Sequence, residues 1–125
     1  MCDVAAGLHE IASSFGACHV LVEHGRAVII DSGLFGTRRR FTQLFQQLWS
    51  GAPQIDAILL THGHLDHTGN AAWLHASTGA PVLAHRADER HLAGTHPYRG
   101  WPRICGRLEA AGRVLARYKP VVIDH

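Results

Sequence analysis

Short apolar runs alternate along the chain with segments of helical period. In the first third, three such runs predict β-strands at residues 8–11, 18–23 and 27–31. The last two are separated by His24-Gly25, and a two-residue gap of this kind is typical of a tight hairpin. The chain is therefore expected to open with antiparallel strands.

The next segment has the spacing of an amphipathic helix. Apolar side chains recur there at intervals of three and four residues, namely Phe41, Leu44, Phe45, Leu48 and Trp49. A stripe of this kind covers one face of an α-helix. We expect Thr37 to cap the helix at its N-terminus, and Gly51 with Pro53 to end it.

The remaining part predicts strands and helices in alternation. Residues 55–61 (IDAILLT) are nearly all apolar, as in a strand that is covered on both faces. The later elements are a helix at 71–78, a strand at 82–84, a helix at 87–93, a loop at 96–102, a helix from 104 to 118 and a strand that begins at 121. A strand, a helix and a strand in succession imply a parallel pair. The predicted fold class is α/β (α+β), a mixed sheet with flanking helices.

The composition is that of an ordinary globular protein. Of the 125 residues, 46% are hydrophobic and 18% are charged, which predicts one domain over residues 1–125. The formal net charge of +2 is too small to indicate a nucleic acid or a membrane surface, so the expected ligand is a small-molecule substrate. Apolar stretches fall far short of the ~20 residues of a membrane span. Cys2, Cys18 and Cys105 form no CxxC pair, which favours free thiols in a reducing compartment, the cytoplasm.

Histidine is the outlier, with 11 copies, three of them in the sequence THGHLDH at residues 61–67. Residues two apart in an extended segment face the same way, so His62 and His64 can present nitrogens to one metal ion. Asp66 and His67 lie beyond the turn, point from a different direction and suit a second ion. Imidazole and carboxylate ligands favour zinc, with iron or manganese as alternatives.

Other polar and aromatic groups have simpler interpretations. The motif histidines could be surface residues of a loop, but their spacing directly after an apolar strand favours a metal site. His85 and His96 are interpreted as loop residues, and the arginines at 38–40 as a solvated helix face rather than a phosphate contact. Three aromatic residues are interpreted as packing rather than as a stacking platform, namely Trp73, Tyr98 and Trp101.

The motif and its surroundings resemble the metallo-beta-lactamase superfamily, whose defining motif is His-x-His-x-Asp-His at the end of a core strand. Residues 18–33 (CHVLVEHGRAVIIDSG) resemble the early hairpin of that family, which ends in an Asp-x-Gly turn. Residues 69–85 (GNAAWLHASTGAPVLAH) resemble its helix and following strand. The resemblance therefore extends over most of the chain.

The resemblance implies a role for each motif residue. His62 and His64 would bind a first metal ion, and Asp66 and His67 a second. Asp31 would be a carboxylate that steadies the ligand loop without touching the metal; the alternative is a simple turn residue.

The implied activity is that of a hydrolase with one or two zinc ions, in which metal-activated water attacks an ester, thioester, lactone or related bond. Asp66 would be catalytic because it would also orient or deprotonate the attacking water. Nucleases of the superfamily usually have Gly where this chain has Leu65, and that departure argues against RNA processing.

Members of the superfamily fold as an αββα sandwich of two similar halves, and further metal ligands come from the second half. This chain is expected to be an N-terminal, incomplete half of that domain. Such a half leaves an apolar face of its sheet uncovered, which predicts self-association. The alternative function is a truncated, non-catalytic metal-binding or interaction module that needs a second half for activity.

Overall fold

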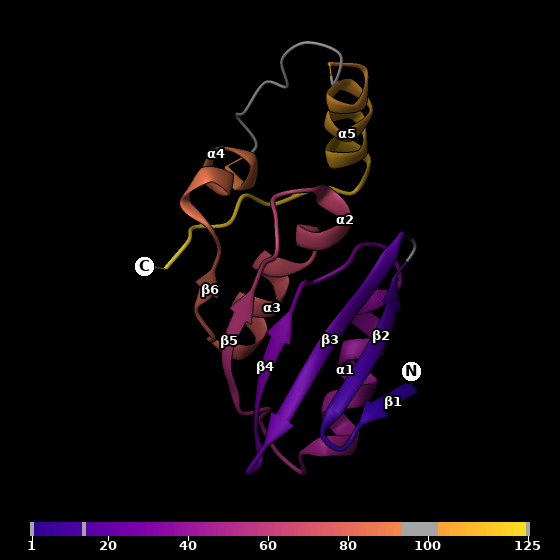
Figure 1. Ribbon diagram of the computed structural model, residues 1–125, viewed down its shortest axis with the longest axis vertical. Coiled ribbons are helices and arrows are strands. Elements are labelled where there is room, and N and C mark those ends of the chain that lie inside the picture. Colours follow the sequence, from indigo (N-terminus) through magenta and orange to yellow (C-terminus); the bar gives the residue numbers. More distant parts are fainter. Residues whose placement is uncertain (1, 14, 94–102, 125) are drawn as a thin grey trace.

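The computed structural model describes residues 2–13, 15–93 and 103–124, built on a six-stranded sheet whose strands follow in chain order (Figure 1). The strands are β1 (Cys2–Ala5), β2 (Leu8–Ser13), β3 (Gly16–Glu23), β4 (Arg26–Ile30), β5 (Ile55–Leu59) and β6 (Val82–Leu83). The helical elements are α1 (Thr37–Leu48), α2 (Leu65–Thr68), α3 (Ala71–Thr78), the 3₁₀ turn η1 (Arg86–Asp88), α4 (Glu89–Leu92) and α5 (Arg103–Leu115).

The sheet is mixed, as the sequence predicts. Strands β1 to β4 pair antiparallel, and β4, β5 and β6 pair in parallel. His24 and Gly25 join β3 to β4 with φ values of 50° and 76°, as a type I′ hairpin turn requires. The parallel pairs are joined by crossovers, with α1 between β4 and β5, and α2 and α3 between β5 and β6. The predicted hairpin and parallel pair are confirmed.

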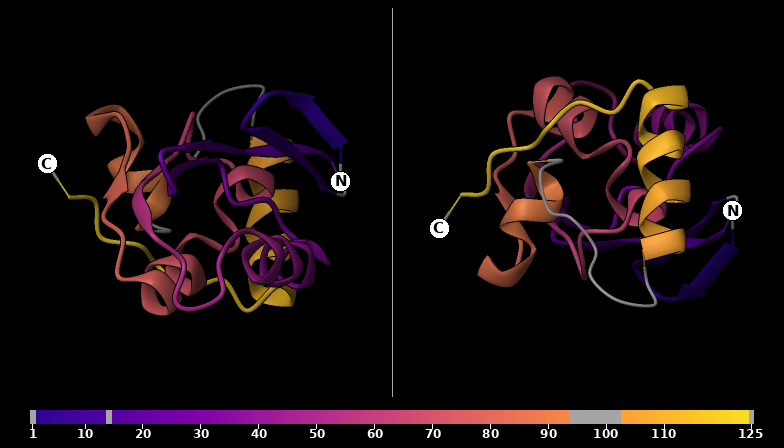
Figure 2. Two further views of the ribbon diagram at one scale, coloured as in Figure 1. Left: turned by 90° about the horizontal axis from the view of Figure 1, so that it is seen from below. Right: turned by 90° about the horizontal axis from the view of Figure 1, so that it is seen from above.

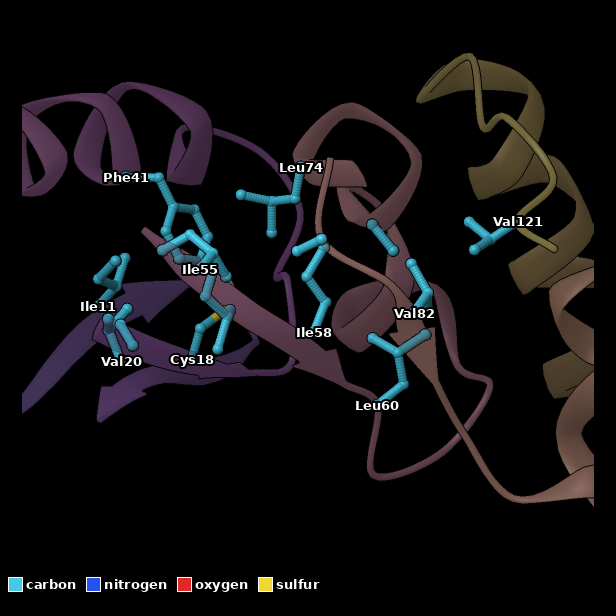
Figure 3. Packing of buried hydrophobic residues seen from close by; sticks show 14 of the residues in the cluster. Ile11, Cys18, Val20, Phe41, Ile55, Ile58, Leu60, Leu74, Val82 and Val121 are labelled. Atoms are coloured by element: carbon cyan, nitrogen blue, oxygen red, sulfur yellow. The ribbon is translucent and has the colours of Figure 1, made fainter. Parts of the chain in front are cut away.

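The core lies on one face of this sheet. Burial alternates along β3 and β4, so that Val20 and Ile29 point to the same side. Helix α1 covers them with Phe41 and Leu44, and α3 adds Leu74 (Figure 3). All five side chains are at most 1% exposed. Figure 2 shows α1 and α3 on the same side of the sheet.

The opposite face of the same strands is apolar and more open. The register places Leu21 beside Val28, and Ile30 beside Leu59. Leu21 is 46% exposed and Leu59 is 37% exposed. The expectation that the strand of residues 55–61 is covered on both faces is therefore wrong, because α1 and α3 pack on one side and leave Leu59 accessible.

Two other details differ from the expectation. Thr37 is not the cap of α1: Gly36 occupies the N-cap position, and the Thr37 hydroxyl donates to the Leu34 carbonyl instead. Residues 121–124 are not a strand, although the Asp124 N–H donates to the Val82 carbonyl at 2.8 Å. The return bond, from the Val82 N–H, goes to the Asp124 carboxylate at 3.0 Å rather than to the backbone, so no ladder forms.

Helices α2 and α5 lie together at one end of the molecule, beyond the ends of β4 and β5 (Figure 1). Seen from above, α5 runs across that end (Figure 2). The loop that carries the THGHLDH motif emerges there, between β5 and α2. Among the residues described, none of the helices has the length and apolar character needed to cross a membrane.

Candidate metal site

The loop between β5 and α2 brings three imidazole rings together. The ring centroid of His62 lies 4.7 Å from that of His64 and 4.0 Å from that of His67. The Asp66 carboxylate adds Oδ2 at 3.3 Å from Nε2 of His67. The sequence predicts that His62 and His64 lie side by side and that His67 points from a different direction, whereas the His67 ring also packs against His62. All four candidate ligands therefore lie in one cluster.

Asp31 holds this loop from the end of β4. Its backbone adopts φ +61°, a region that Asp enters more readily than most residues, and it is 4% exposed. Its Oδ1 accepts the Thr61 backbone N–H at 2.8 Å, and the Thr61 hydroxyl lies 3.0 and 2.8 Å from Oδ1 and Oδ2. Oδ2 also lies 2.8 Å from Nδ1 of His67. A proton on Nδ1 that donates to this carboxylate leaves the Nε2 lone pair of His67 available for a metal.

A second network holds the backbone of His67. Ser32 donates its N–H and its hydroxyl to the His67 carbonyl, at 2.7 and 2.9 Å. Asn70 is 5% exposed and donates its side-chain amide to the carbonyls of Ser32 and Leu34, at 3.1 and 2.8 Å. Buried amides are normally bonded in this way. These bonds tie the segment after β4 to the start of α3, with the ligand loop between them.

Helices α4 and α5 contact the loop from its other side. Arg113 of α5 donates to the Gly63 carbonyl at 2.9 Å and pairs with Glu109, also at 2.9 Å. At Gly63, a Cβ atom would lie 2.5 Å from the Cβ of His91 on α4. Gly63 therefore allows the close approach of α4, and the Arg113 contact fixes its carbonyl.

Burial shifts two titratable groups near the site. It lowers the pKa of His62 below its ordinary value; His67 and His64 add to this lowering, against the opposing charges of Asp31 and Asp66. The neutral imidazole, the form that can ligate a metal, is therefore favoured at His62. Burial also raises the pKa of the Cys18 thiol to about 12, with a further contribution from Asp31, so Cys18 is a neutral core side chain.

The donor set fits a borderline metal such as zinc in its chemistry. Imidazole nitrogens and a carboxylate are ordinary zinc ligands. The contact at Nδ1 of His62 leaves its Nε2 atom to ligate a metal, whereas Nε2 of His67 lies 3.3 Å from the Asp66 carboxylate. In the described part of the chain, however, no three His, Cys, Asp or Glu side chains are placed to hold one ion together. The loop offers ligands of the right type, and they do not yet converge on one point.

Histidines outside the motif have other partners or positions. Nδ1 of His75 lies 2.8 Å from the Ala80 carbonyl, and Nδ1 of His85 accepts the Ala87 N–H at 3.1 Å at the start of η1. His91 of α4 lies closer to the motif, with its ring centroid 6.4 Å from that of His64. His96, Tyr98 and Trp101 lie outside the described residues.

The arginines at 38–40 are exposed, as the interpretation of a solvated helix face expects, and two of them also donate hydrogen bonds. Arg38 donates to the Asn70 side-chain carbonyl at 2.7 Å and lies 5.6 Å from the centre of the Trp73 ring. Arg40 donates to the Ala12 carbonyl. Trp73 is a partly buried packing residue, as predicted.

Sequence reasoning missed four residues that support the loop, namely Thr61, Ser32, Asn70 and Arg113. The one local signal is that Thr61 and Asn70 flank the motif.

Comparison with known proteins gives one consistent family. The family model described as the metallo-beta-lactamase superfamily matches residues 13–125. An uncharacterised protein of Mycobacterium bovis is 40% identical over 110 residues, which are 84% of this chain and 45% of that protein. Probable metallo-hydrolase YybB of Bacillus subtilis is 39% identical over 71 residues, 56% of this chain and 30% of that protein.

The fold is also that of a solved metallo-beta-lactamase structure. A motif mutant of a metallo-beta-lactamase from Cronobacter sakazakii matches 98% of this chain with a TM-score of 0.72, at 24% identity, and the match covers 44% of that chain. The chain therefore spans less than half the length of each of these three proteins. The mixed sheet with its helices agrees with the expected half of an αββα sandwich.

Proposed function

Because this chain belongs to the metallo-beta-lactamase superfamily, as the match over residues 13–125 shows, we propose that it carries the metal-binding loop of a hydrolase that cleaves an ester, thioester or lactone. One observation supports this above the others. Three imidazoles and a carboxylate gather on the loop after β5, and a buried carboxylate, Asp31, contacts one of those imidazoles.

In this proposal His62 and His64 hold one zinc ion, and Asp66 and His67 hold a second, with iron or manganese as alternatives. The chemistry that such a metal supplies is Lewis acidity, which polarises a carbonyl oxygen and makes water acidic enough to ionise near pH 7. The lowered pKa of His62 supports the same assignment, because it keeps the imidazole neutral.

The chain's own residues would do the remaining work. The Asp66 side chain is 30% exposed and lines a cavity, so its carboxylate can orient a water molecule and accept its proton. Asp31 keeps the proton of His67 on Nδ1, and Arg113 holds the loop at the Gly63 carbonyl. The substrate would be a small molecule, and the buried neutral thiol of Cys18 suits a reducing cytoplasm.

The alternative is a non-catalytic metal-binding or interaction module. It is favoured by one observation, that the described residues place no three donors around one ion, which fits a weak or incomplete metal site better than a catalytic centre. The two proposals share the metal site and differ only in turnover, so binding and hydrolysis must be measured separately.

Zinc binding is tested by calorimetric titration at pH 7.5. We expect His62→Ala and His64→Ala to remove most of the binding by the chain. His85→Ala is the matched control, because the His85 side chain is exposed and accepts the Ala87 N–H of η1, outside the motif. Equal losses in His64→Ala and His85→Ala would show that the site lies elsewhere and would overturn the proposal.

Hydrolysis is tested in a chimera, because the chain alone should hydrolyse a thioester, a lactone or an ester no faster than free zinc does. The 110 matched residues of the Mycobacterium bovis relative are replaced by those of this chain. We expect zinc-dependent turnover of at least one of the three substrates, lost in His64→Ala and kept in His85→Ala, with none on a phosphodiester. A chimera that binds zinc but leaves all three substrates intact would refute the hydrolase and favour the module.

A further inference from the structure

A cavity of about 470 Å³ opens beside two of the motif residues, His64 and Asp66. This volume is within the range of roughly 300–1,000 Å³ typical of small-molecule sites. Most of the other side chains that line it are apolar, namely Phe15, Leu34, Phe35, Leu65, Leu108 and Leu115. They come from the β2–β3 turn, the segment after β4, and helices α2 and α5. The cavity is therefore assembled by the tertiary fold at the end of the sheet where the motif lies.

Four of the apolar side chains that line this cavity are largely exposed to solvent. Phe15 is 75% exposed, Phe35 58%, Leu108 70% and Leu115 80%. Single exposed apolar residues are common on protein surfaces, but several gathered around one hollow mark a binding site. Half of the large apolar side chains that stand exposed in the described residues line this one cavity.

Outside the motif, the described residues that line the cavity include no unpaired charged side chain. The acidic residues that line it are Asp66 and Glu109, and the Glu109 carboxylate is paired with Arg113 at 2.9 Å. No lysine or arginine lines it among the described residues. An uncharged hydrocarbon placed against these walls would gain from leaving water, whereas a carboxylate or phosphate would find no lysine or arginine among the described lining residues.

We infer that this cavity binds the uncharged, apolar acyl chain of the substrate and presents the bond to be cleaved to His64 and Asp66. The inference rests on the proposed function for the identity of that bond. It narrows the substrate class from esters, thioesters and lactones in general to those with a hydrocarbon acyl group. Phe15, Leu108 and Leu115 would then determine specificity without taking part in the chemistry.

The cavity can be tested without metal or turnover. Butanol, hexanol and octanol are titrated into the zinc-free chain, and amide NMR shifts report where and how tightly each binds. We expect the dissociation constant to fall about two- to fourfold for each added methylene, since burying a CH₂ group is favourable by about that factor. The shifts should gather around Phe15, Phe35 and the cavity-facing residues of α5.

Two variants of α5 make a matched pair. Leu115→Ser removes a cavity wall, and Val114→Ser changes a neighbour that is 78% exposed but does not line the cavity. We expect Leu115→Ser to weaken octanol binding about threefold or more and Val114→Ser to leave it unchanged. Both positions are exposed, so both variants should fold, which circular dichroism verifies.

Three outcomes would overturn the inference: affinities that do not depend on chain length, equal effects of the two variants, or the absence of alcohol binding. In the last case, a loss of self-association in Leu115→Ser, seen by sedimentation, would assign these side chains to a contact between chains. The test is independent of the proposed function, because a chain that binds octanol but no zinc would refute the hydrolase and leave the cavity. A chain that binds zinc but no octanol would refute the cavity inference and leave the proposed hydrolase.

Discussion

The contact between Asp31 and His67 gives the sharpest prediction about the site. Replacing Asp31 by Ala removes the acceptor of the Thr61 N–H, which lies 2.8 Å from Oδ1. A lost hydrogen bond to a charged group costs roughly 1.5–3 kcal/mol, and Ala tolerates the φ of +61° less well than Asp, by about 1 kcal/mol. We therefore expect Asp31→Ala to lower the free energy of unfolding by about 3 kcal/mol.

Asp31→Asn separates stability from metal binding. Asn keeps the shape, one carbonyl acceptor for Thr61 and a tolerance for positive φ, so its stability loss should be about 1 kcal/mol or less. Its amide N–H₂ would now face Nδ1 of His67, at the position where Oδ2 lies 2.8 Å away. Donation to Nδ1 places the imidazole proton on Nε2, which blocks the nitrogen proposed to ligate the metal. Zinc affinity should fall roughly tenfold to a hundredfold.

Urea unfolding of the zinc-free chain and zinc calorimetry, both at pH 7.5, check these two values. Asp56→Asn is the matched control, because Asp56 is an exposed carboxylate on β5 that pairs with Arg26; it should leave zinc affinity unchanged. A stability loss below about 1 kcal/mol in Asp31→Ala would show that the carboxylate does not hold the loop. Unchanged zinc affinity in Asp31→Asn would show that it does not orient His67.

Three further predictions concern the core, a glycine and the open sheet face. The folded thiol of Cys18 has a pKa of about 12, above that of an unfolded thiol near ~8.5, so the stability that the buried thiol contributes is fully present below pH ~8.5 and is lost as the pH rises. Between pH 9 and 10.5 the free energy of unfolding should therefore fall more steeply in the wild type than in Cys18→Ala, by up to about 1.4 kcal/mol per pH unit. Parallel slopes for the two proteins would refute this prediction. Gly69→Ala should destabilise by about 1–3 kcal/mol, because a Cβ there would lie 2.6 Å from Leu34 Cδ1 and 2.9 Å from two carbonyl oxygens, whereas Gly51→Ala, with nothing within 4 Å, should be neutral in the same urea titration. We also propose that the chain associates through the sheet face that exposes Leu21 and Leu59; light scattering should show dimers or larger species that Leu21→Lys reduces, and a monodisperse wild-type monomer at tens of micromolar would contradict it.

Local pattern determined much of this fold. The His24-Gly25 pair predicts the β3–β4 hairpin because both residues tolerate positive φ, and the stripe from Phe41 to Trp49 predicts α1 because its spacing matches the helical repeat. The motif after an apolar strand likewise locates the candidate metal loop. In each case the information lies within a few consecutive residues, where backbone geometry alone relates one side chain to the next.

Tertiary structure decided the support of the site and the shape of the cavity. Asp31 lies 36 residues before His67, and Arg113 lies 50 residues after Gly63; they meet because β4 and β5 are parallel neighbours and α5 lies across their ends. Asp31 was suspected only from the family resemblance, and Arg113 carried no signal. The periodicity of a segment reports which face is buried but not what covers it, so contacts between distant segments depend on strand order and on the packing of helices against the sheet.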